Sequence, residues 1–293
     1  MITTALRTNV RVRAVMAIAM AASVLAIAPP AWANHPVFVE GNCFGPGMGD
    51  TATGLRQSPV TPSTCGDYDG DGSIGMAEDN DGDNNFGTIN AALTAVAQNG
   101  RVTIVANGTY GEVVTLNPVE RGNVTLEAAP GVSANIDAVV QGDPGSTDRQ
   151  QRPGIIVDGC RRCRVTVRNV ITRNWTDRVR VRGFSHLHLD QVISENNLNY
   201  GIRVKNRAKV SISNSQVNAS GFRKNTAGAG EPNPGIGVEF EDYSRGSIVH
   251  SSITGSARAG INIESQAWRM PLELEDVQLF DNNPNFTQRR ARG

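Results

Sequence analysis

A stretch of twelve residues in the first half of the chain has the composition and spacing of a calcium-binding loop. It reads Asp67-Tyr68-Asp69-Gly70-Asp71-Gly72-Ser73-Ile74-Gly75-Met76-Ala77-Glu78. Acidic residues stand at the positions that supply oxygen ligands, and Gly72 stands where such a loop must turn sharply. The expected ligands are Asp67, Asp69, Asp71, the carbonyl oxygen of Ser73 and a bidentate Glu78. Because hard cations prefer oxygen ligands, the motif predicts Ca²⁺ as the cofactor.

An acidic surface loop without metal is the alternative, because neither flank of the loop has the pattern of a long helix. The loop is therefore EF-hand-like only in its twelve residues, similar to the short calcium loops of secreted proteins. Bound calcium would neutralise clustered carboxylates and order a segment that is too polar to fold alone. A second ion could bind at Asp79, Asp81 and Asp83, which follow the loop directly.

The first 33 residues have the pattern of a cleavable secretion signal. Three arginines precede an apolar run over residues 14–28, and Ala31-Trp32-Ala33 supplies a small-x-small cleavage site. A membrane anchor is the alternative, but the run is shorter than the roughly 20 residues that a span needs. We expect a secreted or periplasmic protein cleaved after Ala33. After loss of the three arginines in residues 1–33, the mature chain has 25 Lys+Arg against 28 Asp+Glu. Its net charge is therefore about −3, which does not suggest a nucleic-acid partner.

Four cysteines in an exported protein favour two disulfides. Proximity in the sequence pairs Cys43 with Cys65 and Cys160 with Cys163. A redox role for the Cys-x-x-Cys pair is the alternative, but Arg161-Arg162 lies in an expected turn between strands and not at a helix start. Zinc is disfavoured because the histidines show no ligand spacing.

A short strand phrase recurs five times in the second half of the chain, at residues 154–158, 179–182, 201–205, 235–239 and 260–264. Counted from Ile155 through Val179, Ile202 and Ile236 to Ile261, the spacings are 24, 23, 34 and 25 residues. A fixed period of this length indicates a solenoid. Such a period suits one coil of three short strands, with each strand paired in parallel to its counterpart about 4.8 Å away in the next coil.

Alternation along each strand separates inward from outward rows across the stacked coils. The expected inward rows are Ile155, Val179, Ile202, Ile236 and Ile261, and Val157, Val181, Val204, Val238 and Ile263. The expected outward rows are Asp158, Arg182, Lys205, Glu239 and Glu264, and Ile156, Arg180, Arg203, Gly237 and Asn262. Asn174 and Asn196 share a turn position, which fits an asparagine ladder or a left-handed turn residue.

Residues 86–286 resemble the right-handed parallel β-helix proteins of the pectin-lyase-like superfamily. The opening segments 86–93 and 102–112 look like that family's short helix, first strand and Gly-Thr-Tyr turn. The resemblance implies an all-β fold, a right-handed parallel β-helix (solenoid) with a short N-terminal capping helix. Ile89, Leu93, Val96 and Ala97 would form the apolar face of that helix.

The expected domains follow from these features. They are a signal peptide (1–33), an N-terminal appendage stabilised by a disulfide and calcium (34–85), the β-helix (86–286) and a flexible basic tail (287–293).

Candidate catalytic residues come from the same resemblance. Polysaccharide lyases of the superfamily combine a calcium-bound acidic cluster with an Arg or Lys on an exposed strand face. This implies Arg203 and Lys205, with Glu239 one coil on, and the insertion 221–234 would overhang them. The alternative is that the charges of one row pair with opposite charges on adjacent coils. The sequence lacks the catalytic motifs of pectin methylesterases and polygalacturonases.

Three functions stay open, because a fold alone does not determine activity. We favour a secreted calcium-binding protein that binds carbohydrate or acts at the cell surface, with acidic polysaccharide or a cell-surface glycan as the expected partner. The second is a polysaccharide lyase or epimerase acting on acidic (uronate) polysaccharide. The third is a purely structural or adhesive envelope component.

Overall fold

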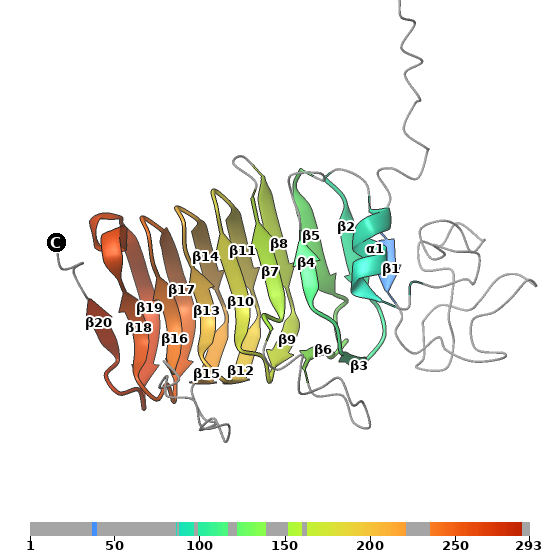
Figure 1. Cartoon of the computed structure of the whole chain (residues 1–293). Helices are drawn as coiled ribbons and strands as arrows, with labels where there is room; N and C mark the ends of the chain where they lie inside the picture. The colour runs from blue at the N-terminus through green and yellow to red at the C-terminus, as the bar shows by residue number, and fades with distance from the viewer. Residues whose placement is uncertain are drawn as a thin grey trace, which may run out of the picture. The chain divides into compact units, whose positions relative to one another are not determined.

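The fold is a stack of coils built almost entirely from parallel strands. The computed structural model describes residues 37–39, 86, 88–96, 99–116, 122–138, 152–159, 163–220 and 235–288. A full coil contributes one strand to a seven-stranded sheet and two to a 13-stranded sheet, which bends to form two walls. Strands of successive coils lie side by side along the stack (Figure 1). The expected all-β parallel β-helix is confirmed.

Three sets of strands form the walls. One wall of the 13-stranded sheet contains β1 (Val37–Val39), β2 (Arg101–Ile104), β5 (Val124–Ala128), β8 (Arg164–Arg168), β11 (His186–Asp190), β14 (Lys209–Ser213), β17 (Arg245–Thr254) and β19 (Leu272–Phe280). The other wall contains β3 (Gly108–Tyr110), β6 (Ala134–Asp137), β9 (Val170–Arg173), β12 (Ile193–Asn197) and β15 (Gln216–Ser220), and the second half of β17 joins it. The seven-stranded sheet contains β4 (Val114–Leu116), β7 (Ile155–Asp158), β10 (Asp177–Arg182), β13 (Tyr200–Val204), β16 (Ile236–Phe240), β18 (Ala259–Ile263) and β20 (Phe286–Gln288).

The inward rows are those expected, except at β16. Val238, and not Ile236, lies between Ile202 and Ile261, because β16 is shifted by two residues. Ile236, Val238 and Phe240 all point inward and are buried, so the sequence pattern alone allows either register. A shift of two keeps every side chain on its own face. It does, however, move Glu239 out of the Lys205 row and into the Arg203 row.

Left-handed residues make the tight bends between strands. Asn169, Gln191 and Asn214 have φ of 54°, 56° and 50° at the bends between the two walls of the 13-stranded sheet. Asn174 and Asn196 have φ of 64° and 57°, which confirms the prediction of left-handed turn residues. Asparagine suits these positions because its short polar side chain tolerates this conformation.

The N-terminal end of the core is covered by α1 (Ile89–Ala95), the expected capping helix. Thr88 is its N-cap, and Ile89, Leu93 and Val96 are buried against the core. The Glu112 carboxylate accepts hydrogen bonds from the backbone N–H groups of Ile89 (2.6 Å) and Asn90 (2.9 Å). These contacts satisfy helix N–H groups that have no partner within the helix itself.

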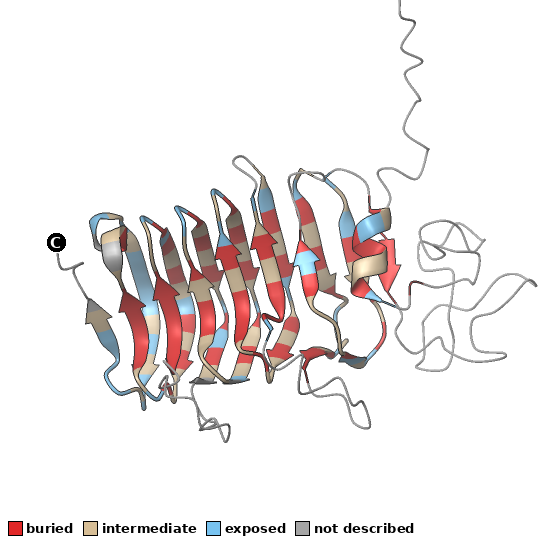
Figure 2. Ribbon diagram, in the orientation of Figure 1, coloured by how far each residue is buried: buried red, intermediate tan, exposed pale blue. Residues whose placement is uncertain are grey.

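The last described coil leaves apolar side chains exposed. Leu274 follows Ile248 in an inward row, and Phe286 follows Ile261, yet they are 44% and 43% exposed. Figure 2 shows the change from buried inward positions in the middle coils to exposed residues on β19 and β20. Burial in this fold therefore comes from stacking on a neighbouring coil.

Several predictions lie outside the described residues: the signal peptide and its cleavage site, the calcium loop, the second acidic run, Cys43, Cys65 and Cys160, the insertion 221–234 and the tail from residue 289. Cys163, which is described, is not a free thiol. Both disulfide pairings remain predictions. In the described part of the chain, no helix is long and apolar enough to cross a membrane.

Candidate functional site

The structure brings the three predicted catalytic residues to the outward face of the seven-stranded sheet. Arg203 on β13 lies 3.2 Å from the Glu239 carboxylate on β16, measured between Nε and Oε2. The same guanidinium lies 2.7 Å from Glu241, the next outward residue after Glu239. Lys205 Nζ lies 3.2 Å from Glu241 as well. The expected pairing of Lys205 with Glu239 is therefore wrong, because the shift of β16 places Glu241 beside Lys205.

Two further side chains contact this cluster of Arg203, Lys205, Glu239 and Glu241. The Arg203 guanidinium stacks over the Tyr200 ring, with Cζ 4.4 Å from the ring centroid. Asn262 Nδ2 donates to Glu239 Oε1 at 3.1 Å from the next coil. Glu239 is 1% exposed, although it points outward from the strand. Both cations thus lie within a network that already contains their counter-ions.

Burial divides the two glutamates into a protonated and an ionised member. Desolvation raises the pKa of Glu239 to about 9, and its hydrogen bond and repulsion with Glu241 add to this effect. Burial also opposes ionisation of Glu241, but its hydrogen bond from Glu239 and the charge of Arg203 hold its pKa below the usual value. Arg203 makes its shortest contacts with Glu241, which agrees with the negative charge residing there. Glu239 therefore carries a proton at neutral pH.

Ion pairing along rows extends over neighbouring coils. Arg182 Nε lies 2.6 Å from the Asp158 carboxylate, as expected for opposite charges on adjacent strands. Arg203 and Lys205 are also paired, so Arg182, Arg203 and Lys205 all lie in ion pairs on the described part of this face. The geometry fits a charge ladder better than a catalytic site with a free Arg or Lys.

A second candidate site lies on the 13-stranded sheet and was not predicted. A groove of about 660 Å³ crosses β8, β11, β14 and β17 near their N-terminal ends. Arg164, His186, Lys209 and Arg245 line it and are register partners on successive strands. We call these four residues the basic row and the hollow the basic groove. Among the described residues, no carboxylate forms an ion pair with Arg164, Lys209 or Arg245.

Polar side chains form the next outward row, two residues further along each strand. On β5, β8, β11, β14 and β17 this row consists of Thr125, Thr166, His188, Ser211 and Ser247. Thr125 and Thr166 line the groove together with the basic row. The groove therefore offers hydrogen-bonding groups beside its cations.

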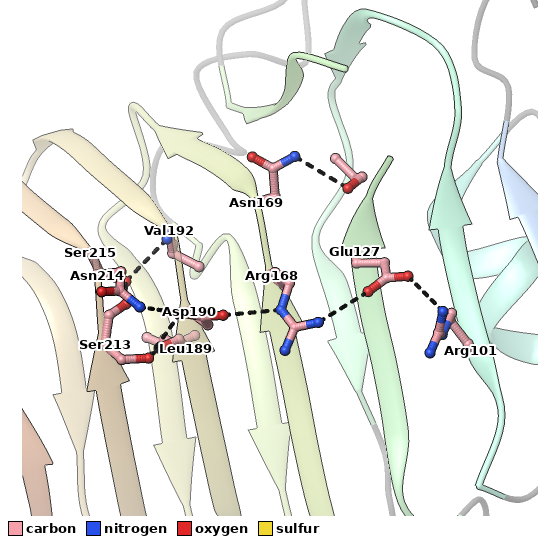
Figure 3. Close-up of polar contacts among 11 residues, drawn as sticks. Arg101, Glu127, Arg168, Asn169, Leu189, Asp190, Val192, Ser213, Asn214 and Ser215 are labelled. Atoms are coloured by element: carbon pink, nitrogen blue, oxygen red, sulfur yellow. Dashed lines mark hydrogen bonds and ion pairs between the residues drawn. The ribbon is translucent and has the colours of Figure 1, made fainter. Parts of the chain in front are cut away.

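The third outward row of the same sheet is a charge ladder. In this row, Arg168 lies 3.7 Å from Glu127 and 3.0 Å from Asp190. Arg101, the register partner of Thr125, lies 3.2 Å from Glu127. Asp190 also accepts a hydrogen bond of 2.9 Å from Asn214 (Figure 3). Acids and bases alternate in this row, whereas the basic row has cations at three of its four positions.

Phe184 and Arg207, in the turns that precede β11 and β14, line the basic groove, and Tyr243 lies against Arg207. Phe184 and Tyr243 are 43% and 39% exposed. The Arg207 guanidinium lies between them, with Cζ 5.7 Å from each ring centroid. This stack of Phe184, Arg207 and Tyr243, which we call the aromatic margin, spans three coils. Large aromatic rings usually gain stability from burial, so these two exposed rings mark a candidate binding surface.

Comparison with known proteins agrees with this architecture. Residues 153–286 match the family model described as right handed beta helix region. The described strands therefore form a parallel β-helix of repeated coils. This fits the pectin-lyase-like superfamily in general terms. Neither the comparison with curated proteins nor that with solved structures gave a match.

A sequence signal for the groove of this β-helix repeat protein does exist. The tripeptides 184–186, 207–209 and 243–245 each place an aromatic residue or Arg, a small residue and a basic residue or His in that order. The interval of 36 residues between the second and third copies conceals the repeat. Gly246 follows the last copy where the earlier coils have Leu187 and Val210, so the apolar phrase is also interrupted there.

Proposed function

We propose that this chain is a secreted carbohydrate-binding protein in which the β-helix is a rigid scaffold. The observation that carries the proposal is the basic groove, which is lined by the exposed ring of Phe184, by Arg207 against the exposed Tyr243, and by hydroxyl groups beside its cations. Ligand sites combine aromatic surface with a few polar groups that fix orientation. A sugar offers the complementary surface, because it has apolar C–H faces and hydroxyl groups around the ring.

The lyase or epimerase alternative receives less support. At the predicted catalytic residues it requires a cation free to meet the substrate carboxylate, and on that face both Arg203 and Lys205 are engaged by Glu241. Glu239 is buried and protonated at neutral pH, so it is not a ready general base. A purely structural role leaves the exposed aromatic margin and the basic row without a purpose.

Removing the aromatic margin should abolish most of the binding. We expect the double variant Phe184→Ala with Tyr243→Ala to bind its glycan at least about tenfold more weakly, equivalent to about 1.4 kcal/mol. Glycan-array screening identifies the ligand, and calorimetric titration measures its affinity. Phe280→Ala is the matched control, since Phe280 is 49% exposed but lies on β19. Equal losses of glycan affinity in the double variant and in Phe280→Ala would count against the proposal. Release of unsaturated uronate, detected by ultraviolet absorbance, would also count against it.

Calcium binding at the 67–78 loop is part of the same proposal. Extracellular calcium is abundant, so weak affinity is sufficient for a structural ion. Calorimetric titration of the metal-free mature protein should show heat of binding by millimolar Ca²⁺, and Glu78→Gln should weaken it because one bidentate carboxylate is lost. Glu264→Gln serves as the control. Absence of heat at millimolar Ca²⁺ would refute the site.

A further inference from the structure

We infer that the basic groove binds a linear acidic glycan, whose carboxylate or sulfate groups meet the basic row coil by coil. This inference rests on the proposed carbohydrate binding and specifies the class of sugar. It also places the acidic ligand on the 13-stranded sheet and not on the seven-stranded face that contains Arg203 and Lys205.

The cations of the basic row lack counter-charges among the described residues. Like charges directly opposite on neighbouring strands are destabilising. Arg164, Lys209 and Arg245 nevertheless share one row, and no carboxylate of the described residues is paired with them. On the same sheet, Glu127, Arg168 and Asp190 alternate in sign and lie in contact. The chain thus forms a balanced ladder four residues along the strand, so the unbalanced row is suited to an anion from outside.

The shape of the basic groove suits a polymer better than a small anion. Strands in a sheet are about 4.8 Å apart, so four successive strands present their side chains over roughly 14 Å along the stack. The groove of about 660 Å³ follows these strands. A single small anion would occupy only one position of such a row. A polymer lying along the stack, across the strands, can place several acidic groups against cations in different coils.

One member of the basic row, His186, is neutral. Burial, then the charges of Lys209 and Arg164, lower the pKa of His186 to about 4, with smaller contributions from His188 and Arg245. His186 is therefore an uncharged imidazole at neutral pH, and it lies between Arg164 and Lys209. Its ring can hydrogen-bond a hydroxyl group between two acidic substituents. A sugar chain supplies both kinds of group.

Nucleic acid fits the molecule less well. The whole chain has 28 Lys+Arg and 28 Asp+Glu, so no general positive charge attracts a phosphate backbone. The cations of the basic row lie in one groove, beside the hydroxyl groups of Thr125 and Thr166. Hydrogen-bonding groups next to a limited number of cations are suited to a hydroxyl-rich acidic polymer.

The test is titration of the full chain with four probes of similar length: a polyuronate, a sulfated glycan, a neutral polysaccharide and single-stranded DNA. We expect one of the two acidic glycans to bind best, and which one identifies the acidic group. Affinity should fall with added salt, because ionic contacts are screened. Lys209→Glu and Arg245→Glu should each reduce affinity at least about tenfold, or about 1.4 kcal/mol. Arg258→Glu, with the same change of charge before β18, should change it less than about twofold.

The possible outcomes separate this inference from the proposed function. Binding of the neutral polysaccharide that depends on Phe184 and Tyr243 but not on Lys209 would leave carbohydrate binding intact and overturn the acidic class. Binding to no polysaccharide would overturn both. Single-stranded DNA binding as tightly as the acidic glycans would also overturn the inference. If Lys209→Glu fails to fold, Lys209→Gln removes the charge alone, and unchanged affinity in that variant would contradict the role of the row.

Discussion

Replacing Glu239 by Gln is expected to remove a loss of stability that the wild-type protein undergoes between about pH 5 and 9. The folded state holds a proton on Glu239 because its pKa is raised to about 9, whereas the unfolded chain releases that proton near the ordinary value of 4.5. Over this interval the folded state binds more protons, so the free energy of unfolding decreases as pH rises. One such proton corresponds to at most about 1.4 kcal/mol per pH unit. Gln keeps the shape of the side chain but cannot lose the proton.

Urea unfolding at a series of pH values measures this effect. The wild-type midpoint should decline toward alkaline pH, and the Glu239→Gln midpoint should stay nearly level. Asp190→Asn is the control, because the contacts of that carboxylate with Ser213, Asn214 and Arg168 lower its pKa and confine its titration to acidic pH. From pH 5 to 9, the free energy of unfolding of this control should therefore decrease by the same amount as that of the wild type. A Glu239→Gln variant with the wild-type slope would contradict the assignment of the proton.

The repeated phrase predicted the coil well because burial and alternation are local properties. Val179 and Ile202 lie in one inward row as expected, since each coil offers only one way to bury its apolar residues. The register of β16 was predicted two residues off. Ile236, Val238 and Phe240 are equivalent in the pattern, so alternation alone does not choose among them.

The basic groove could not be predicted in the same way because it depends on residues that are distant in sequence. Gly246 interrupts the apolar sequence pattern in the coil that contributes Arg245, so that coil is hard to recognise in the sequence. It faces inward, where a Cβ would lie 2.5 Å from the Val210 carbonyl oxygen and 3.0 Å from the Phe240 ring. The ring of Phe240 thus fills the space that an apolar side chain occupies in other coils. Once Gly246 is aligned with Val210, Arg245 necessarily lies beside Lys209.

The cluster of Arg203, Lys205, Glu239 and Glu241 depends on tertiary structure in the same way. Arg203 and Lys205 are prominent in the sequence as charged residues on an outward strand face. Their neutralisation by Glu241 depends on the register of β16, and the protonation of Glu239 depends on its burial. Neither property is encoded in the spacing of the charges.

Leucines in one inward row should differ sharply in importance according to their place in the stack. Leu189 is completely buried, and the row continues through Ile212 and Ile248 to Leu274, which is 44% exposed. Removing a buried leucine side chain costs about 3 kcal/mol, because apolar contacts are lost and a cavity remains. Leu274 has less buried surface to lose, so its truncation should cost under about 1 kcal/mol.

The most direct test of the stacked interior is therefore the urea midpoint of Leu189→Ala compared with that of Leu274→Ala, interpreted with the measured dependence of unfolding on denaturant. Stacking of coils predicts a large decrease for Leu189→Ala and a small one for Leu274→Ala, although both residues belong to the same row. Equal decreases in the two variants, or a larger decrease for Leu274→Ala, would contradict the continuous inward row on which the basic groove and the charge ladders depend.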